Sequence, residues 1–237
     1  MGWQRTTNWR PARTGTASTQ SGSGPVQHQE TGELGYAKTA QALAYREKVA
    51  SDLAALIGVP VPEVRLDKVE GSPEWHAISI VFGSESVDVP LLRERLKQLY
   101  ESPAVKDAFR RSSGLLALHA WLATEDLKDE HVVVSANRDG TYDAAAIDFA
   151  YSMNVPADGG DVRAPDGPPT LVGNVDGNVI RDAVERIERT TDEKIRAVVD
   201  GLPDELLSRA GKDQLVSALC ARRGKIREAV KQKGWLS

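Results

Sequence analysis

The chain has 237 residues, 41% of them hydrophobic, and a formal net charge of −4, so it can bury one large core or the cores of two small lobes. The acidic balance argues against a general nucleic-acid binder, and the single cysteine, Cys220, excludes an internal disulfide framework. No apolar run approaches the roughly 20 residues that span a bilayer, and the N-terminus lacks a signal-peptide core, so we expect a cytoplasmic protein without a membrane segment.

The first 33 residues are polar and rich in glycine, serine and threonine. We expect residues 1–24 to form an arm, which is either flexible or, through the run Thr14–Gly24, a loop whose backbone N–H groups approach a phosphate. The run matches neither of the common phosphate-binding glycine patterns. Both interpretations therefore stay open for this arm.

A strand and a helix follow, and each carries one charged residue of interest. The run Leu34–Lys38 predicts a strand that ends in Lys38, and the apolar spacing of Thr39–Gly58 predicts an amphipathic helix. Glu47 falls in the middle of this helix. A glutamate there is usually solvated, but one that follows a strand ending in lysine can pair with that lysine and orient it.

Further strands and helices precede the most informative stretch of the chain. Alternating and helical patterns predict, in order, two strands and two helices: Val61–Val69, Trp75–Phe82, Pro90–Tyr100 and Ala104–Ala123. The last of these contains His119, whose leucine neighbours indicate a core histidine rather than a catalytic one.

A predicted β-hairpin carries acidic residues at both of its ends. Two apolar runs, His131–Ser135 and Ala144–Phe149, flank an Asn-Arg-Asp-Gly turn, and an Asp-Gly pair supplies the positive φ that a hairpin turn needs. Asp126 lies in the loop five residues before His131, and Asp148 closes the second strand. Strand pairing should bring the two acids to one cleft with His131 between them. A loop acid, a metal-ligand type and a second acid in this order are typical of kinase-like phosphotransferases.

A long irregular segment and a series of helices complete the chain. Asn154–Asn174 contains four prolines and shows no periodicity, which is typical of a functional loop. Helical patterns and first-turn signals predict four helices after it: Asp176–Arg189, Thr191–Gly201, Pro203–Ala210 and Asp213–Lys233.

The segment Asp126–His131 resembles the catalytic loop of the protein-kinase-like superfamily, D-L-K-x-x-N, and Ile147–Phe149 resembles its D-F-G-like element. The I-D-F form is also typical of aminoglycoside phosphotransferases and of HipA-like kinases, an atypical bacterial family. Four further features are similar to the HipA-like family: Lys38 and Glu47 followed by Leu56–Pro62, the Phe82-Gly83-Ser84 triplet, the helix that carries Trp121, and Gln214–Ile226.

The resemblance implies an α+β, two-lobed protein-kinase-like fold. Residues 25–85 would form a nucleotide-binding N-lobe made of a small antiparallel sheet and one helix. Residues 86–237 would form a mostly helical C-lobe, with the catalytic hairpin at 126–149 and the long loop at 154–174.

The resemblance also implies an ATP-dependent kinase that transfers a phosphoryl group to a hydroxyl of a protein or of a small molecule, with ATP and Mg²⁺ as cofactors. The residues that match its motifs are, for catalysis, Asp126 and Lys128; for the nucleotide, Lys38, Glu47, Phe82 and Gly83; and for the metal, His131 and Asp148.

The clearest departure from the motif is His131, which stands where the family has a metal-binding asparagine. Histidine binds divalent metals, but Mg²⁺ prefers oxygen ligands, so His131 points either to Mn²⁺ or to a weak catalyst. Two alternatives follow. One is a pseudokinase that senses nucleotide or binds a partner protein. The other is an aminoglycoside-type phosphotransferase, for which the span from Glu47 to Asp126 leaves little room for a substrate-binding insertion.

Overall fold

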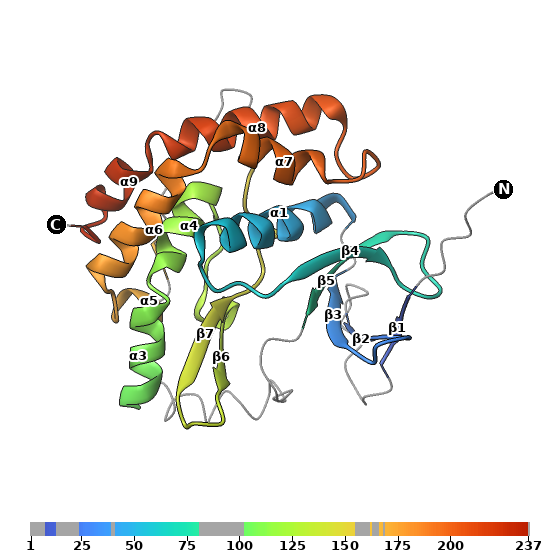
Figure 1. Cartoon of the computed structure of the whole chain (residues 1–237), viewed down its shortest axis with the longest axis horizontal. Coiled ribbons are helices and arrows are strands. Elements are labelled where there is room, and N and C mark those ends of the chain that lie inside the picture. Colours follow the sequence, from blue (N-terminus) through green and yellow to red (C-terminus); the bar gives the residue numbers. More distant parts are fainter. Residues whose placement is uncertain are drawn as a thin grey trace.

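The molecule has a five-stranded antiparallel sheet at one end and a group of helices at the other, with α1 (Gln41–Ile57) between them (Figure 1). The structure, a computed structural model, describes residues 8–12, 24–38, 41–80, 102–154, 162, 166–167 and 169–236. The α+β, two-lobed class that we predicted is confirmed. No helix within these residues is long and apolar enough to cross a membrane.

The sheet curls until its first and last strands meet. Its strands are β1 (Trp9–Pro11), β2 (Gly24–His28), β3 (Leu34–Lys38), β4 (Val64–Lys68) and β5 (Trp75–Ile80), in the order β1-β2-β3-β5-β4. Trp9 forms an isolated bridge with Val69, just beyond β4, and its carbonyl oxygen accepts the N–H of Glu70 at 2.8 Å. The two outer strands of the sheet are therefore joined to each other.

Two strands of this sheet were missed by the sequence patterns. Both β1 and β2 lie in the polar first part of the chain, and β1 lies within the segment that we expected to be an arm. Trp9 is buried, and it forms the small core of the sheet with Val26, Ala37, Val69 and Ile78. One buried tryptophan is therefore enough to anchor a three-residue strand.

The strand predicted at Val61–Val69 is shorter in the structure. β4 begins only at Val64, because Pro60 and Pro62 have no N–H to donate to a neighbouring strand. The hydroxyl of Ser51, on α1, donates to the carbonyl of Pro62 at 2.9 Å and accepts the N–H of Val64 at 3.1 Å. Ser51 of α1 thus forms hydrogen bonds with the backbone of Pro62 and Val64 at the start of β4.

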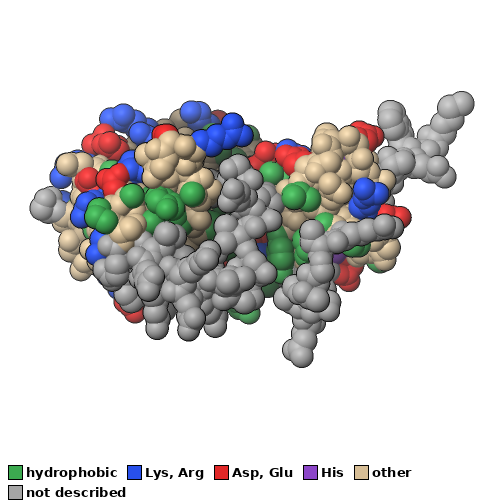
Figure 2. All heavy atoms as spheres, turned by 90° about the horizontal axis from the view of Figure 1, so that it is seen from below, with side chains coloured by type: hydrophobic (Ala, Val, Ile, Leu, Met, Phe, Trp, Pro, Cys, Tyr) green, Lys and Arg blue, Asp and Glu red, His purple; other side chains and the backbone are tan. Residues whose placement is uncertain are grey.

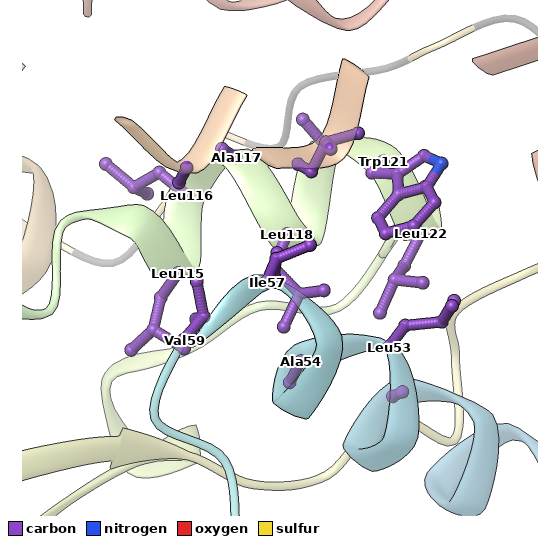
Figure 3. Packing of buried hydrophobic residues seen from close by; sticks show 14 of the residues in the cluster. Leu53, Ala54, Ile57, Val59, Leu115, Leu116, Ala117, Leu118, Trp121 and Leu122 are labelled. Carbon is purple, nitrogen blue, oxygen red and sulfur yellow. The ribbon is translucent and has the colours of Figure 1, made fainter. Parts of the chain in front are cut away.

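The helices surround α4, in which all nine residues are buried. They are α3 (Pro103–Arg111), α4 (Gly114–Leu122), α5 (Pro169–Val172), α6 (Gly177–Arg189), α7 (Asp192–Asp200), α8 (Arg209–Arg223) and α9 (Ile226–Gln232). Leu53 and Ile57 of α1 meet Leu118 and Leu122 of α4 in the large core (Figure 3). The indole N–H of Trp121 donates to the carbonyl of Leu219 at 2.9 Å.

The helix predicted at Ala104–Ala123 is two helices, separated at Ser112 and Ser113. The hydroxyl of Ser112 donates to the carbonyl of Ala144 in the hairpin at 2.8 Å, and α3 packs along that hairpin. Gly114 starts α4, where a Cβ would lie 3.1 Å from the Cβ of Ala183. The break therefore lets α3 follow the hairpin while α4 enters the core and packs closely on α6.

The two last predicted helices also need correction. The predicted helix Pro203–Ala210 is not helical before Arg209: its first part forms a turn, and Nζ of Lys212 donates to the carbonyl of Leu202 at 2.6 Å. Ser208 caps α8, which starts at Arg209 instead of Asp213. The predicted helix Asp213–Lys233 is broken after α8, so that Ile226 and Val230 of α9 point into the core. The helices predicted at Asp176–Arg189 and Thr191–Gly201 are confirmed, with Asp176 and Thr191 as their N-caps.

The predicted β-hairpin is confirmed, with small shifts of its ends. β6 (Val132–Ala136) pairs with β7 (Tyr142–Ala146), and Gly140 in the turn has a φ of +83°. His131 lies before the strand, in a single turn of 3-10 helix. Asp148 does not close β7: it lies two residues beyond the strand, with a φ of +66°.

Several expectations fall on residues outside those described: most of Thr14–Gly24, the triplet Phe82–Ser84 and the helix Pro90–Tyr100. The long loop Asn154–Asn174 is described only in part, and its end contains the short helix α5.

Charged side chains of both signs are interspersed over the helical part on the face shown in Figure 2. Ion pairs between helices include Arg227 with Glu188, at 2.6 Å, and Arg196 with Asp213, at 2.8 Å.

Candidate functional site

The end of β3, the middle of α1 and the segment after β7 meet at Lys38. Its Nζ lies 2.8 Å from Oε1 of Glu47 and 3.1 Å from Oδ1 of Asp148. Glu47 is only 3% exposed, and its carboxylate is paired with Lys38. The predicted pair of Lys38 and Glu47 is confirmed, and Asp148 joins it. Three charged groups from three separate elements therefore share one point between the sheet and the helices.

The backbone after Asp148 is tied to the same helix. The oxygen Oε1 of Glu47 that binds Lys38 also accepts the N–H of Phe149, at 3.1 Å. Arg46, the preceding residue of α1, donates from Nη1 to the carbonyl of Ala150 at 2.8 Å. Asp148 itself has a left-handed backbone, which is uncommon for a residue with a side chain. Its orientation toward Lys38 thus depends on contacts from α1.

The second acid and its lysine lie in the loop before the hairpin. Nζ of Lys128 is 2.9 Å from Oδ2 of Asp126. The hydrogen bond to Asp126 is the main cause that raises the pKa of Lys128, and attraction to Asp126, Glu130 and Asp148 adds to it. Lys128 is therefore attracted both to Asp126, which was predicted for catalysis, and to Asp148, which was predicted for the metal. The side chain of Asp126 is about one-third exposed, so solvent reaches it.

His131 is held by the backbone of the same loop. Its Nδ1 lies 2.9 Å from the carbonyl oxygen of Asp126. Because a carbonyl oxygen only accepts, Nδ1 is the donor of this hydrogen bond, which leaves Nε2 as the ring nitrogen available to a metal. The carbonyl of His131 accepts the N–H of Ile147 at 2.8 Å, which joins the loop to the residue before Asp148.

The side chains of Asp148 and His131 are suited to a metal ion only together with the phosphates of a nucleotide. Within the described ranges, no three His, Cys, Asp or Glu side chains gather closely enough to hold a metal. A Mg²⁺ or Mn²⁺ ion in a nucleotide site needs one or two protein ligands, because phosphate oxygens and water supply the others. The carboxylate of Asp148 and Nε2 of His131 are of the types that such an ion accepts.

An aromatic contact joins the segment after β7 to the core of the helices. The ring of His119 stacks on that of Phe149, with centroids 4.9 Å apart and an interplanar angle of 14°. His119 is fully buried, and burial, followed by the nearby His131, lowers its pKa to about 3. Its Nδ1 lies 3.0 Å from the hydroxyl of Thr124. The prediction of a core histidine is confirmed, and the ring remains neutral.

Six of the eight residues predicted for the site are described. Lys38, Glu47 and Asp148 are in direct contact, while Asp126, Lys128 and His131 form a second group joined to the first through Ile147. Phe82 and Gly83 lie outside the described residues. Sequence reasoning missed Arg46, for which position next to Glu47 was the only signal, and the contact of His119 with Phe149.

Two solved structures are similar to this chain along most of its length. The proinflammatory kinase CtkA of Helicobacter pylori matches with a TM-score of 0.63 and 15% identity, over 93% of this chain and 94% of CtkA. HipA of Shewanella oneidensis MR-1, solved with HipB and operator DNA as a toxin–antitoxin system, matches with a TM-score of 0.51 and 14% identity. That match covers 84% of this chain and 60% of HipA.

The sequence itself matches no protein-family model and no curated protein. At identities of 14–15%, the structural likeness shows the fold and leaves the chemistry to the site. The chain has the two-lobed fold that CtkA and HipA share, and this is the fold that its resemblance to the HipA-like kinases implied.

Proposed function

We propose that the protein is an ATP-dependent kinase that transfers a phosphoryl group to a hydroxyl of a protein or of a small molecule. The observation that carries this proposal is the meeting of Lys38, Glu47 and Asp148 at 2.8 and 3.1 Å. A lysine oriented by a helix glutamate beside a metal-type aspartate is the arrangement that kinases use at the phosphates. The fold shared with the kinase CtkA supports the proposal.

In this proposal ATP binds between two lobes. The first lobe consists of residues 25–85 together with β1, and the second consists of residues 86–237. Lys38 binds the α- and β-phosphates, and Glu47 keeps its ammonium group in place. Asp148 and Nε2 of His131 would hold the divalent ion, which would neutralise phosphate charge. Because an imidazole nitrogen is a softer ligand than the amide oxygen of asparagine, His131 favours Mn²⁺ over Mg²⁺ at its position.

The acceptor reacts at the second group of residues. Asp126 accepts the proton of the acceptor hydroxyl. At the same time the oxygen of that hydroxyl bonds to the γ-phosphorus, and the bond between the γ-phosphorus and ADP breaks. Lys128, 2.9 Å from Asp126, lies where its charge can stabilise the transferring group. Catalysis here consists of positioning and electrostatic stabilisation rather than of covalent chemistry by the protein.

A second candidate function is a pseudokinase that senses nucleotide or binds a partner protein. It is favoured by His131, which stands in the place of the metal-binding asparagine. The difference between the two functions is therefore whether nucleotide and metal bind together and whether a phosphoryl group is then transferred.

The test is a thermal-shift series with ATP, ADP and GTP, each with Mg²⁺ or Mn²⁺, combined with detection of labelled phosphate on the protein. A nucleotide at a hundredfold excess over its Kd should stabilise the fold by about 2.7 kcal/mol. Asp148→Ala should abolish the metal-dependent part of the shift. Asp126→Ala should keep nucleotide binding and lose phosphoryl transfer.

His131→Asn separates the two candidates. If His131 limits a working site, the variant should bind Mg²⁺-ATP more tightly than the wild type does. A wild type without a nucleotide shift in either metal, together with no gain in His131→Asn, would refute the kinase and leave the pseudokinase that acts through a partner protein.

A further inference from the structure

Two adjacent residues of α1 bind two consecutive residues of the segment that follows Asp148. Glu47 accepts the N–H of Phe149 at 3.1 Å, and Arg46 donates to the carbonyl of Ala150 at 2.8 Å. Phe149 and Ala150 are more than 100 positions away from Glu47 and Arg46 in the sequence. The two contacts together fix both the position and the direction of this backbone relative to α1.

The segment needs such support because its backbone is strained at both ends. Asp148 has a φ of +66° and Met153 a φ of +55°, and neither is a glycine. Left-handed residues with side chains persist only when their surroundings hold them there. The remaining contacts come from the helical lobe: the N–H of Met153 donates to the carbonyl of Leu122 at 2.7 Å, and the N–H of Glu125 donates to the carbonyl of Tyr151 at 3.0 Å.

Arg46 is unusual among the charged residues of α1. Its guanidinium forms no ion pair with any described residue, and besides Ala150 it contacts the ring and hydroxyl of Tyr45. By contrast, Lys48 forms an ordinary pair with Asp52 on the helix surface, at 2.7 Å. A half-buried cation directed at a backbone carbonyl loses hydration without gaining a partner of opposite charge, which indicates a positional role.

We propose that Arg46 is a positioning residue that keeps Asp148 turned toward Lys38 and toward the metal-bearing phosphates. The inference rests on the proposed function, since it assigns Arg46 a part in the same nucleotide site. Arg46 touches neither nucleotide nor metal; it acts through the backbone of Ala150. Loss of its contact leaves Glu47 alone to hold the segment from the side of α1, and lets Asp148 relax from its left-handed conformation.

The expected effect is selective. Arg46→Ala should retain the thermal shift caused by nucleotide alone, because Lys38 and Glu47 remain, but lose most of the additional shift caused by Mn²⁺ or Mg²⁺. Groups that orient a metal ligand typically change metal affinity by about 10- to 100-fold, and we expect a weakening in this range. In phosphoryl transfer, kcat should fall more than KM for ATP rises. Arg46→Lys, which keeps the charge and one donor, should restore part of the metal-dependent shift.

The experiment measures thermal shifts of the full chain with ADP alone and with ADP plus Mn²⁺ for the wild type, Arg46→Ala, Arg46→Lys and the matched control Lys48→Ala. Lys48→Ala should behave as the wild type in both conditions. Amide hydrogen exchange of residues 147–154 without ligand supplies a second readout, and it should be faster in Arg46→Ala than in the control.

Two outcomes are distinguishable. A wild type that binds ADP with metal, and an Arg46→Ala that keeps the full metal-dependent shift and unchanged exchange, would overturn this inference and leave the proposed function standing. A wild type with no ADP shift in any metal would overturn the proposed function and the inference with it.

Discussion

The sheet and the helices of this protein are built around cores of very different size. Among the described residues, the sheet encloses a small core in which Trp9 is the largest side chain. The helices enclose a far larger cluster centred on α4, to which α1 contributes Leu53, Ala54 and Ile57. Thus α1 packs on the sheet through Ala44, but most of its buried hydrophobic residues belong to the core of the helices.

This difference decides how the site is held. Glu47 is a residue of α1, whose buried face is part of the large core of the helices. Lys38 is a residue of β3, which contributes to the small core of the sheet. The ion pair between them therefore joins a strongly anchored element to a weakly anchored one. Local opening is easiest where few apolar contacts are lost, so the sheet should open before the helices do.

The largest expected effect comes from Trp9 and Trp121, which are almost equally buried, at 1% and 0% exposure, but lie in different cores. Trp121→Ala should lower the free energy of unfolding by about 4 kcal/mol, in the range for a fully buried aromatic residue. Trp9→Ala should cost roughly half as much, because a three-residue strand can detach without unfolding the rest. Denaturant unfolding followed by circular dichroism measures both. Equal losses would show that the two cores unfold as one, and would break the comparison.

A medium effect is expected at the junction itself. Glu47→Ala removes the buried acceptor of Lys38 and of the Phe149 N–H, and should cost about 2–3 kcal/mol, since Lys38 keeps Asp148 as a partner. Asp52→Ala, which breaks a partly exposed i,i+4 pair on the surface of the same helix, is the control and should cost at most about 0.5 kcal/mol. Similar values for both in urea unfolding would mean that the junction does not stabilise the fold.

The smallest effect concerns His119 and pH. Burial lowers its folded pKa to about 3, so below its ordinary value of 6.5 the unfolded chain takes up a proton that the folded protein does not. Its contribution is complete above pH 6.5 and is lost as the pH falls toward 3, by about 2 kcal/mol at pH 5. The wild type should therefore lose more stability between pH 7 and 5 than His119→Phe, measured by urea unfolding without metal. Parallel losses would contradict a neutral His119.

Local signals predicted the parts of the fold that depend on nearby residues. The Asp-Gly turn predicted the hairpin, the apolar spacing predicted α1, and helical patterns predicted α6 and α7, the latter also through its first-turn acids. The contact of Lys38 with Glu47 was also accessible, because it joins neighbouring elements.

The remaining features depend on distant contacts. The break at Ser112 follows from the hairpin and α6, which lie far along the chain, although the change from an amphipathic α3 to a wholly apolar α4 was a visible sign. The strand β1 is too short to show a period. The left-handed backbone of Asp148 is maintained by α1, a hundred positions earlier, and no local pattern announces it.

The bridge between Trp9 and Val69 has a consequence for solubility. An open sheet ends in two strands whose unpaired N–H and C=O groups invite pairing with another molecule. Here β1 meets the chain just beyond β4, and Glu70 donates to Trp9, so the few residues of β1 cover both ends of the sheet at once. A shortened chain that starts at Gly24 would expose the edges of β2 and β4 together and lose the tryptophan that fills the space between them. Such a chain would be prone to edge-to-edge aggregation even though its helices are untouched.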